Sequence, residues 1–390
     1  MIVLGNQLAL QFAIGNKENI FLKQDFLEIE DFQYMRIAEN GGGLRPIINL
    51  TFQVNHEDVI PYLNTGNIIT IMYGIQKPSS KIMQFEILGD NKSKDYHVGS
   101  TVSILGGLYN RGFTDQIKSD TFLKKKSYEV LRQISAQNGF NFITNSNIKT
   151  NDAQNWYQSG MKDWQMTNFV ANRAYKDSET FFVYGFDSQN FYFYDLKQHL
   201  ADGIKWFLSV TSVGQDERSN VVNIGTYSCD DSNAGSNAKF AGKNITNVCY
   251  NLDTGEFSNP KYQLKTFTTM DTNSVNVNSA DCINYNYQIT TSDEHNFSVK
   301  AQNQNFRNNV LYSSYTCHVP VTGQYREFQL FDVVQLIPAD RDKEAEGIYF
   351  ISGIAKEYKD MQYTTILTLN RESANGIKGD LDGGISTGEG

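Results

Sequence analysis

The chain has 390 residues, 40% of them hydrophobic, and its 34 Lys and Arg against 43 Asp and Glu give a formal net charge of −9. An acidic balance of this kind gives no general attraction to phosphate, which argues against specific nucleic-acid binding. No window reaches the roughly 18 apolar residues of a membrane span, and Met1 to Gly15 lack the basic flank of a secretory signal, so we expect a soluble protein made in the cytoplasm with no membrane partner.

Residues 1–112 show the alternation of apolar and polar residues that is typical of strands with one buried face. It is clearest over 8–14 and 48–54, and it recurs over 69–73, 83–87 and 102–104. Turn sequences separate these runs: Asn40-Gly41-Gly42-Gly43, Asn64-Thr65-Gly66-Asn67 and Gly89-Asp90-Asn91. Short strands at this spacing, in a chain with 22 Tyr and 25 Phe, predict a barrel or sandwich.

Residues 113–205 change to a mixed pattern. Apolar positions at helical spacing predict a helix from Ser127 to Asn138. Ser127 or Thr121 is the expected cap at its start, and Gly139 stands where a left-handed residue ends many helices. A second helix is predicted over 163–175 because its apolar residues form one stripe.

Beyond these helices strand patterns return, interrupted by a long polar stretch. The predicted strands are 180–184 and 191–194, which form a hairpin, then 207–211, 221–227, 310–319, 333–337, 348–354 and 363–369, of which the last two form another hairpin. Residues 226–306 are rich in Asn and Ser and contain strand candidates at 263–269 and 282–290, so we interpret them as an elaborated insertion. The glycine-rich end predicts a flexible tail.

These patterns predict a mainly β (α+β) fold in five parts. They are a first β-barrel domain at 1–112, an inserted α+β domain at 113–205, a second β-barrel domain at 206–225 and 307–370, a polar β insertion at 226–306, and a flexible C-terminal tail at 371–390.

No motif marks an active site. The chain lacks a G-x-S-x-G elbow, a G-x-x-x-x-G-K-[ST] phosphate loop and an H-E-x-x-H zinc motif. The five histidines show no metal-ligand spacing, and the adjacent Cys317 and His318 would point to opposite faces of a strand; the histidines are His56, His97, His199, His295 and His318. A glycosidase needs paired carboxylates, but Glu28, Glu30 and Asp31 fit an acidic surface loop better. We therefore predict no enzyme, and no catalytic, cofactor-binding or metal-binding residues.

The sequence allows more than one interpretation of the cysteines and of the tryptophans. Cys229, Cys249, Cys282 and Cys317 are far apart and form no C-x-x-C pair. We expect free thiols in a reducing cytoplasm, and the alternative is one disulfide within 228–303 if the protein meets oxidising surroundings. Two tryptophans, Trp164 and Trp206, are predicted to pack in the core, whereas Trp156 lies in a polar run and fits a core and an interface equally well.

Several segments together carry a family resemblance. Ser127–Gly139 has the form of a helix with Ser at its start and Gly at its end, and it is followed by Gln158-Ser159, then Asp163-Trp164, then a hairpin ending in Phe193-Tyr194-Asp195. This succession resembles the insert of phage baseplate hub proteins and of the hub-like front half of type VI secretion spikes. Arg218–Gly225 and 347–369 resemble the opening strand and closing hairpin of the second tube-like barrel of such hubs. One departure is Leu330-Phe331-Asp332, which stands where the family has a P-G-D turn.

The resemblance implies a structural role. It implies a homotrimer in which each chain contributes two tube-like barrels, so that the ring adapts a hexameric tail tube to a trimeric central spike and forms part of the DNA channel. The implied partners are the spike, the tail tube or distal tail protein, the tape measure protein and the baseplate wedge proteins. The implied location is the virion, in the tail baseplate, after assembly in the host bacterial cytoplasm.

The sequence is also compatible with three other functions. The aromatic content and the polar insertion favour a receptor- or carbohydrate-binding virion protein as the first alternative. A cell-wall hydrolase is the second, and the hub of a secretion or other contractile injection machine is the third.

Overall fold

The computed structural model describes most of the chain. The described residues are 2–4, 8–15, 32–54, 62–75, 81–95, 99–177, 180–210, 220–230, 245–258, 284–290, 301–302, 304–305, 312–313, 315–323, 326–338, 342, 344–359 and 362–371. Among them, no helix is long and apolar enough to cross a membrane.

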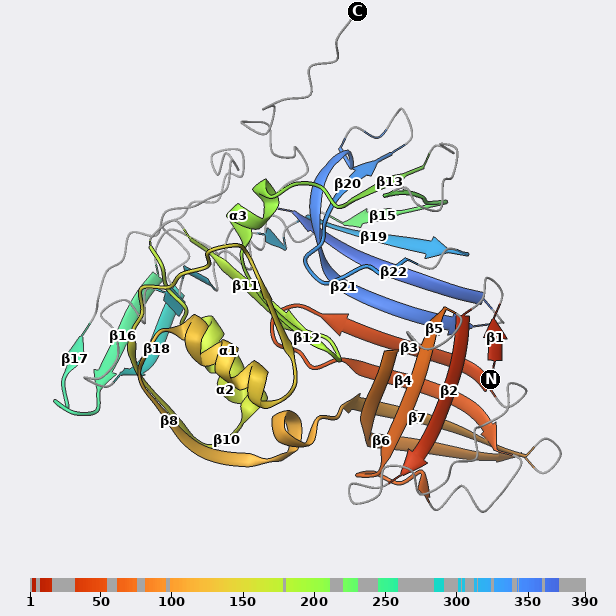
Figure 1. The fold of residues 1–390 in the computed structure, drawn as a ribbon, viewed down its shortest axis with the longest axis horizontal. Coiled ribbons are helices and arrows are strands. Elements are labelled where there is room, and N and C mark those ends of the chain that lie inside the picture. Colours follow the sequence, from red (N-terminus) through yellow and green to blue (C-terminus); the bar gives the residue numbers. More distant parts are fainter. Residues whose placement is uncertain are drawn as a thin grey trace, which may run out of the picture.

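Seven strands from the first part of the chain form one antiparallel, curved sheet (Figure 1). They are β1 (Ile2–Leu4), β2 (Leu8–Gly15), β3 (Phe32–Asn40), β4 (Ile47–Val54), β5 (Ile68–Ile75), β6 (Lys81–Asp95) and β7 (Gly99–Leu108), in the spatial order β1-β2-β5-β6-β7-β4-β3. In β4 the buried Ile48, Leu50 and Phe52 alternate with half-buried polar residues. The five strands predicted in this region are thus confirmed, and β1 and β3 are two additional ones.

The predicted turn at Gly89-Asp90-Asn91 was wrong. These residues continue β6, which pairs with β7 from Phe85–Leu108 to Asp95–Gly99 and shifts register between Ile87 and Gly89. A β-bulge absorbs one extra residue without ending the ladder. Local composition suggested a turn, but β7 supplies hydrogen-bond partners that the local sequence does not reveal.

The middle of the chain is an α+β segment. Its elements are η3 (a π-helical turn, Arg111–Asp115), β8 (Ile117–Lys125), α1 (Ser127–Gln137), β9 (Asn141–Thr144), β10 (Gln154–Lys162), α2 (Asp163–Asn172), β11 (Phe182–Phe186), β12 (Asn190–Asp195) and α3 (Leu196–Ala201). Strands β8 and β10 form a two-stranded sheet, and β11, β12 and β9 form a three-stranded one. The two predicted helices and the predicted hairpin are confirmed.

Details of the helix ends differ from the prediction because of one distant residue. Asp152 is fully buried, and its carboxylate accepts hydrogen bonds from the backbone N–H groups of Ser127 (3.0 Å) and Tyr175 (2.9 Å). Ser127 is therefore the first residue of α1 and not its cap, while Glu129 accepts from the backbone N–H of Lys126 at 2.9 Å. Helix α2 ends at Asn172, three residues earlier than predicted. Gly139, with φ of +76°, has the predicted left-handed conformation.

Seven later strands form the other half of the large sheet. They are β13 (Trp206–Ser209), β14 (Val221–Asn223), β15 (Ser228–Asp230), β19 (Tyr315–Thr322), β20 (Val333–Ile337), β21 (Gly347–Lys359) and β22 (Gln362–Arg371). The predicted strand 221–227 is shorter, because β14 ends at Asn223 and β15 begins only at Ser228; the strand predicted from residue 310 begins at Tyr315. Arg371, predicted as the first residue of the tail, ends β22.

The two halves are joined edge to edge. Strand β21 pairs with β3 from Gly353–Asn40 to Lys359–Tyr34, which makes a single 14-stranded sheet from both ends of the chain. Figure 1 shows the halves side by side, with the α+β segment against both. A small separate sheet consists of β16 (Ile245–Asn251), β17 (Phe257–Ser258) and β18 (Asn284–Thr290); the strand candidate 263–269 and residues 372–390 of the predicted tail lie outside the described residues.

Candidate functional site

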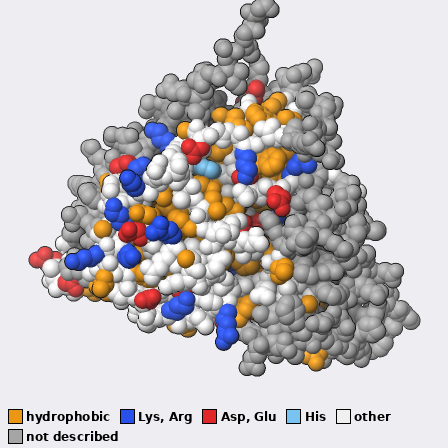
Figure 2. Space-filling view, in the orientation of Figure 1, with side chains coloured by type: hydrophobic (Ala, Val, Ile, Leu, Met, Phe, Trp, Pro, Cys, Tyr) orange, Lys and Arg blue, Asp and Glu red, His pale blue; other side chains and the backbone are white. Residues whose placement is uncertain are grey.

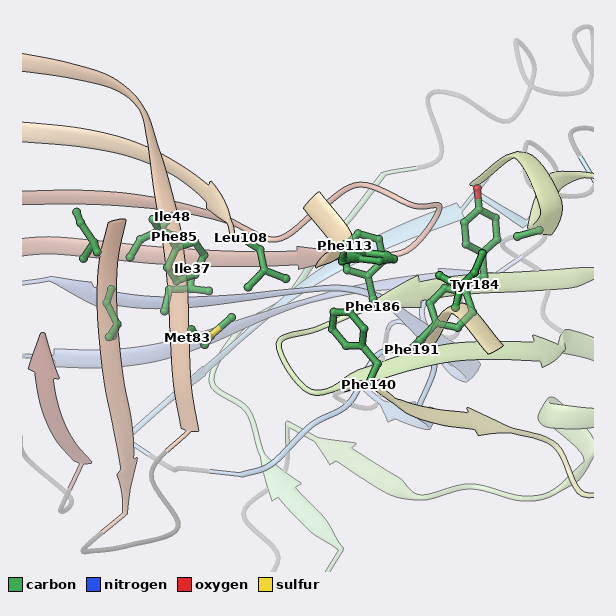
Figure 3. Packing of buried hydrophobic residues seen from close by; sticks show 14 of the residues in the cluster. Ile37, Ile48, Met83, Phe85, Leu108, Phe113, Phe140, Tyr184, Phe186 and Phe191 are labelled. Atoms are coloured by element: carbon green, nitrogen blue, oxygen red, sulfur yellow. The ribbon is translucent and has the colours of Figure 1, made fainter. Parts of the chain in front are cut away.

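The β11–β12 hairpin lies between two hydrophobic cores. All five residues of β11 are buried, and so are residues 191–195 of β12. Side chains alternate between the faces of a strand, so Phe182, Tyr184 and Phe186 enter one core while Phe181 and Val183 enter the other. Figure 3 shows the first of these cores running from Ile37 and Phe85 of the first half of the sheet to Phe186 and Phe191 of the hairpin. The hairpin is therefore the structural centre of the molecule.

Phe331 connects this hairpin to both halves of the sheet. Its ring lies 6.3 Å from that of Tyr192 and 6.3 Å from that of Phe350, between centroids. Its backbone has φ of +68°, a left-handed conformation that costs an ordinary residue about 1–2 kcal/mol. The ring of Phe331 is 2% exposed and packs in the second core.

Polar groups hold the Phe331 turn in place. The carbonyl oxygen of Phe331 accepts a hydrogen bond from Nε2 of His199 at 2.8 Å, and the imidazole stacks on Tyr194 with centroids 3.9 Å apart. Burial lowers the pKa of His199, outweighing the hydrogen bond to Phe331 that raises it. Asp332 accepts from Lys205 Nζ at 2.8 Å and from Trp206 Nε1 at 2.9 Å, which ties the turn to the start of β13. His199 thus supports the fold and is not placed as a metal ligand.

Glycines allow the backbones to approach closely at this junction. Gly41 and Gly185 form an isolated antiparallel bridge between the first half of the sheet and β11. A Cβ on Gly185 would lie 3.2 Å from Cα of Gly41 and 3.3 Å from a ring carbon of Phe331, tighter than most real contacts. Gly41 and Gly185 thus allow close packing at this junction.

A cavity of about 300 Å³ lies beside Phe331. It is lined by the turn at Gly41, by Tyr184 of β11 and by Phe350 and Asn370 of the second half of the sheet. Burial raises the pKa of Tyr184 to about 12, so its hydroxyl stays protonated near neutral pH. The cavity wall contains no carboxylate, histidine or lysine among the described residues. It offers no acid–base pair for hydrolysis.

Asp163 is the centre of a second polar cluster. Its carboxylate is 1% exposed, and it accepts from Lys118 Nζ at 2.5 Å, from Asn138 Nδ2 at 2.7 Å and from Gln158 Nε2 at 2.8 Å. These contacts connect β8, the end of α1, β10 and the start of α2. A buried carboxylate with its hydrogen-bond partners supplied makes such a polar cluster rigid and stabilises the fold. Gln158 and Asp163 therefore stabilise the junction between these elements.

A buried ion pair crosses the line where the two halves of the sheet meet. Lys356 of β21 donates to Glu39 of β3 at 3.0 Å, although the two residues are 317 positions apart, and their side chains are only 10% and 5% exposed. A buried pair of this type is costly to break, because the remaining charge loses its partner in a low-dielectric setting. It helps to specify the β3–β21 pairing.

Two strands of the second half are linked by a disulfide, which corrects the expectation of free thiols. Cys229 of β15 lies opposite Cys317 of β19, with Cα atoms 4.0 Å and sulfur atoms 2.00 Å apart. The alternative placed a bridge within 228–303, which excludes Cys317. The pairing joins residues 88 positions apart, so the strand topology and not the cysteine spacing brings them together. The side chains of Cys249 and Cys282 lie outside the described residues.

The other residues considered for chemistry give no site. His318 is exposed while Cys317 is buried, as predicted for neighbours on a strand. His56, His97, His295, Glu28, Glu30 and Asp31 lie outside the described residues, and the residues that are described contain no group of three side chains able to hold a metal. Trp156 is 1% exposed and donates its Nε1–H to the carbonyl of Lys125 at 2.8 Å, so it belongs to the core. Trp164 and Trp206 are half-buried and pack at the edges of the cores.

Comparison with known proteins gives structural similarity without sequence similarity. No family model matches the sequence, and no curated protein matches it. Among solved structures, a tail protein from Neisseria meningitidis MC58 is 12% identical, with a TM-score of 0.55, over 95% of this chain and 98% of that one. The 43 kDa tail protein of prophage MuSo2 from Shewanella oneidensis is 12% identical, with a TM-score of 0.53, over 94% of this chain and 99% of that one.

A third solved structure extends the similarity to secretion machinery. The E. coli c3393 protein, a component of the type VI secretion system with structural similarity to the T4 tail proteins gp27 and gp5, is 9% identical, with a TM-score of 0.51, over 94% of this chain and 78% of that one. The mainly β fold expected from the resemblance is thus confirmed: the chain has the fold of phage tail proteins and of a type VI secretion component.

Proposed function

We propose that this chain is the structural baseplate hub of a contractile phage tail. The observation that carries the proposal is the structural match to two tail proteins, one from Neisseria meningitidis MC58 and one from prophage MuSo2, over nearly the full length of both chains. A local motif can be shared by proteins of different function, whereas this similarity covers 95% of the chain and 98% of the Neisseria meningitidis tail protein, which makes the same kind of building block the simplest interpretation.

The proposed assembly is a homotrimeric ring. Each chain contributes two seven-stranded halves joined through β3 and β21, so three chains supply six similar units around one axis. Such a ring can meet a hexameric tail tube on one side and a trimeric central spike on the other. In the proposed ring the terminal strands of the sheet order, β1 and β14, would be covered by neighbouring subunits.

The proposed partners follow from this position. They are two further copies of the chain, the spike, the tail tube or distal tail protein, the tape measure protein and the baseplate wedge proteins. DNA passes through the ring without specific binding, which is compatible with a net charge of −9. The location is the virion, at the tail baseplate.

Mass determination in solution tests the assembly. We expect sedimentation velocity of the purified protein, alone or mixed with its spike, to show a species of three chains, and electron micrographs to show a three-fold ring with a hole. Monomers under all conditions, including excess spike, would overturn the proposal. A peptidoglycan zymogram and a glycan array should be blank, since clear lysis would favour a cell-wall hydrolase and glycan binding a receptor-binding protein.

A further inference from the structure

The cavity beside Phe331 has the size and the position of a small-molecule site. Its volume of about 300 Å³ is at the lower end of the range found for such sites. Its walls come from parts of the chain that are far apart in sequence: the turn after β3, the hairpin strand β11, the Phe331 turn, and strands β21 and β22. A molecule bound there would contact both halves of the large sheet and the α+β segment.

Four aromatic side chains line this cavity. Phe331 and Phe350 are stacked, with ring centroids 6.3 Å apart and 26° between the ring planes, and the ring of Tyr312 lies 6.4 Å from that of Phe350. Tyr184 of β11 is the fourth, and each of the four is 8% exposed or less. Aromatic rings pair favourably with a further ring at centroid distances of about 4.5–7 Å. The walls therefore favour a flat aromatic ligand, and the volume suits one or two fused rings, since a cavity of about 150 Å³ holds benzene.

Asn370 of β22 gives the cavity a hydrogen-bond acceptor. This lining residue is 7% exposed, and its Oδ1 has no hydrogen-bond partner among the described residues. A buried amide oxygen without a partner is costly, so a ligand that donates to it gains a bond that the protein does not supply. Ser352, which also lines the cavity, already donates to the carbonyl oxygen of Thr368 at 3.2 Å. Asn370 is thus the group that would orient a bound molecule.

The cavity is unsuited to an ion. Its described lining residues include no charged side chain, and burying a charge without a counter-charge is costly. Aromatic rings attract cations, but the lining residues that the structure describes add no carboxylate to them. Figure 2 shows basic and acidic side chains interspersed over the described residues of one face, so the surface there does not select one sign of ligand charge either. The ligand is therefore neutral.

We propose that this cavity binds a neutral aromatic ring system with an N–H or O–H donor, such as an indole, with the ring against Phe331 and Phe350 and the donor on Oδ1 of Asn370. The ring belongs either to a free small molecule or to a Trp or Tyr side chain of another protein. This inference goes beyond the proposed structural role, which requires no ligand, and neither depends on the other.

Calorimetric titration with indole and with 1-methylindole tests the proposal. The two probes have nearly the same shape, but 1-methylindole has no N–H donor. We expect the native protein to bind indole with a dissociation constant of about 1 mM or lower, and 1-methylindole about tenfold more weakly. Asn370→Leu should bring the two probes to the same affinity, because it removes the acceptor. Ser352→Phe should prevent binding of both, because the added ring fills the cavity.

The matched control is Thr364→Leu. Thr364 is a half-buried residue of the same strand, about 20 Å from Asn370 along β22, so both affinities should stay as in the native protein. Circular dichroism and melting temperatures of the free variants show whether they fold; if Ser352→Phe does not, the two-probe comparison in Asn370→Leu still decides. N-acetyltryptophanamide separates the two sources: binding as tight as that of indole indicates a side chain of another protein, and much weaker binding a free molecule.

Three results would overturn the inference. The first is native protein that binds no indole at about ten times the expected dissociation constant. The second is equal affinity of the native protein for the two probes, because the donor then has no acceptor. The third is indole binding that is unchanged in both Asn370→Leu and Ser352→Phe, because the site then lies elsewhere. None of these results alters the sedimentation test of the proposed ring, which is measured without any probe.

Discussion

The β11–β12 hairpin and the β8–β10 sheet belong to the same segment of the chain, yet their surroundings are opposite. Every residue of β11 is buried, whereas Phe122 is the only buried residue of β8. Both strands are extended and carry aromatic or aliphatic side chains. The difference lies in what covers the second face: the second half of the large sheet covers the hairpin, whereas Ile117 and Leu123 of β8 stay exposed. An alternating pattern thus identifies a strand, and only its neighbours decide whether it is a core element or a surface.

The strongest way to test this comparison is to truncate one apolar side chain in each element. Phe186→Ala in β11 should lower the free energy of unfolding by about 3–5 kcal/mol, because the ring is fully buried and leaves a cavity. Ile117→Ala in β8 should change it by less than about 0.5 kcal/mol, because this side chain is largely exposed. Denaturant unfolding at equal protein concentration measures both. Equal losses would show that the two elements are not buried differently.

Substitutions in the Glu39–Lys356 ion pair test how much this contact between β3 and β21 contributes to the stability of the sheet that surrounds the hairpin. Glu39→Gln should cost about 3 kcal/mol, because it leaves the Lys356 ammonium buried without a counter-charge. The double substitution Glu39→Leu with Lys356→Met should recover most of this loss, because it removes both charges. Thermal unfolding of the single and double variants gives the comparison. A double variant as unstable as the single one would contradict the assignment of the cost to the unpaired charge.

The smallest expected effect concerns the backbone of Phe331. Alanine and glycine at this position both lose the ring that packs against the hairpin, but only glycine adopts φ of +68° without strain. Phe331→Gly should therefore be more stable than Phe331→Ala by about 1 kcal/mol, the reverse of the usual order in regular structure. Unfolding curves of the two variants decide this. If alanine is equal or better, the turn has relaxed, and the left-handed conformation is not imposed by its surroundings.

Much of the site was not predictable from local sequence. The hairpin was expected, but not its burial on both faces, because the second face is covered by β13, β20 and β21 from far along the chain. Trp156 was ambiguous because its neighbours in sequence are polar, while Phe122, which lies opposite it, is 34 positions away. The free thiols were a wrong prediction, because cysteine spacing carries no information on strand pairing. The positive φ of Phe331 had one indication in the sequence: Leu330-Phe331-Asp332 stands where the hub proteins that the sequence resembles have a P-G-D turn, and Phe331 takes the place of its glycine.

The strands, the helix and the helix end that depend on residues near one another in the chain could be predicted from the sequence. Alternation over Leu8–Ile14 and Ile48–Val54, helical periodicity over 127–137 and the glycine at 139 each act within a few residues, so strands, helix and helix end could be predicted. Three features became known only from the tertiary structure: the β3–β21 pairing, the Glu39–Lys356 ion pair and the hydrogen bonds of Asp152 to the backbone at Ser127 and Tyr175. These depend on contacts between residues far apart in the sequence, which come together when apolar surface is removed from water on folding, so local patterns carry no signal for them.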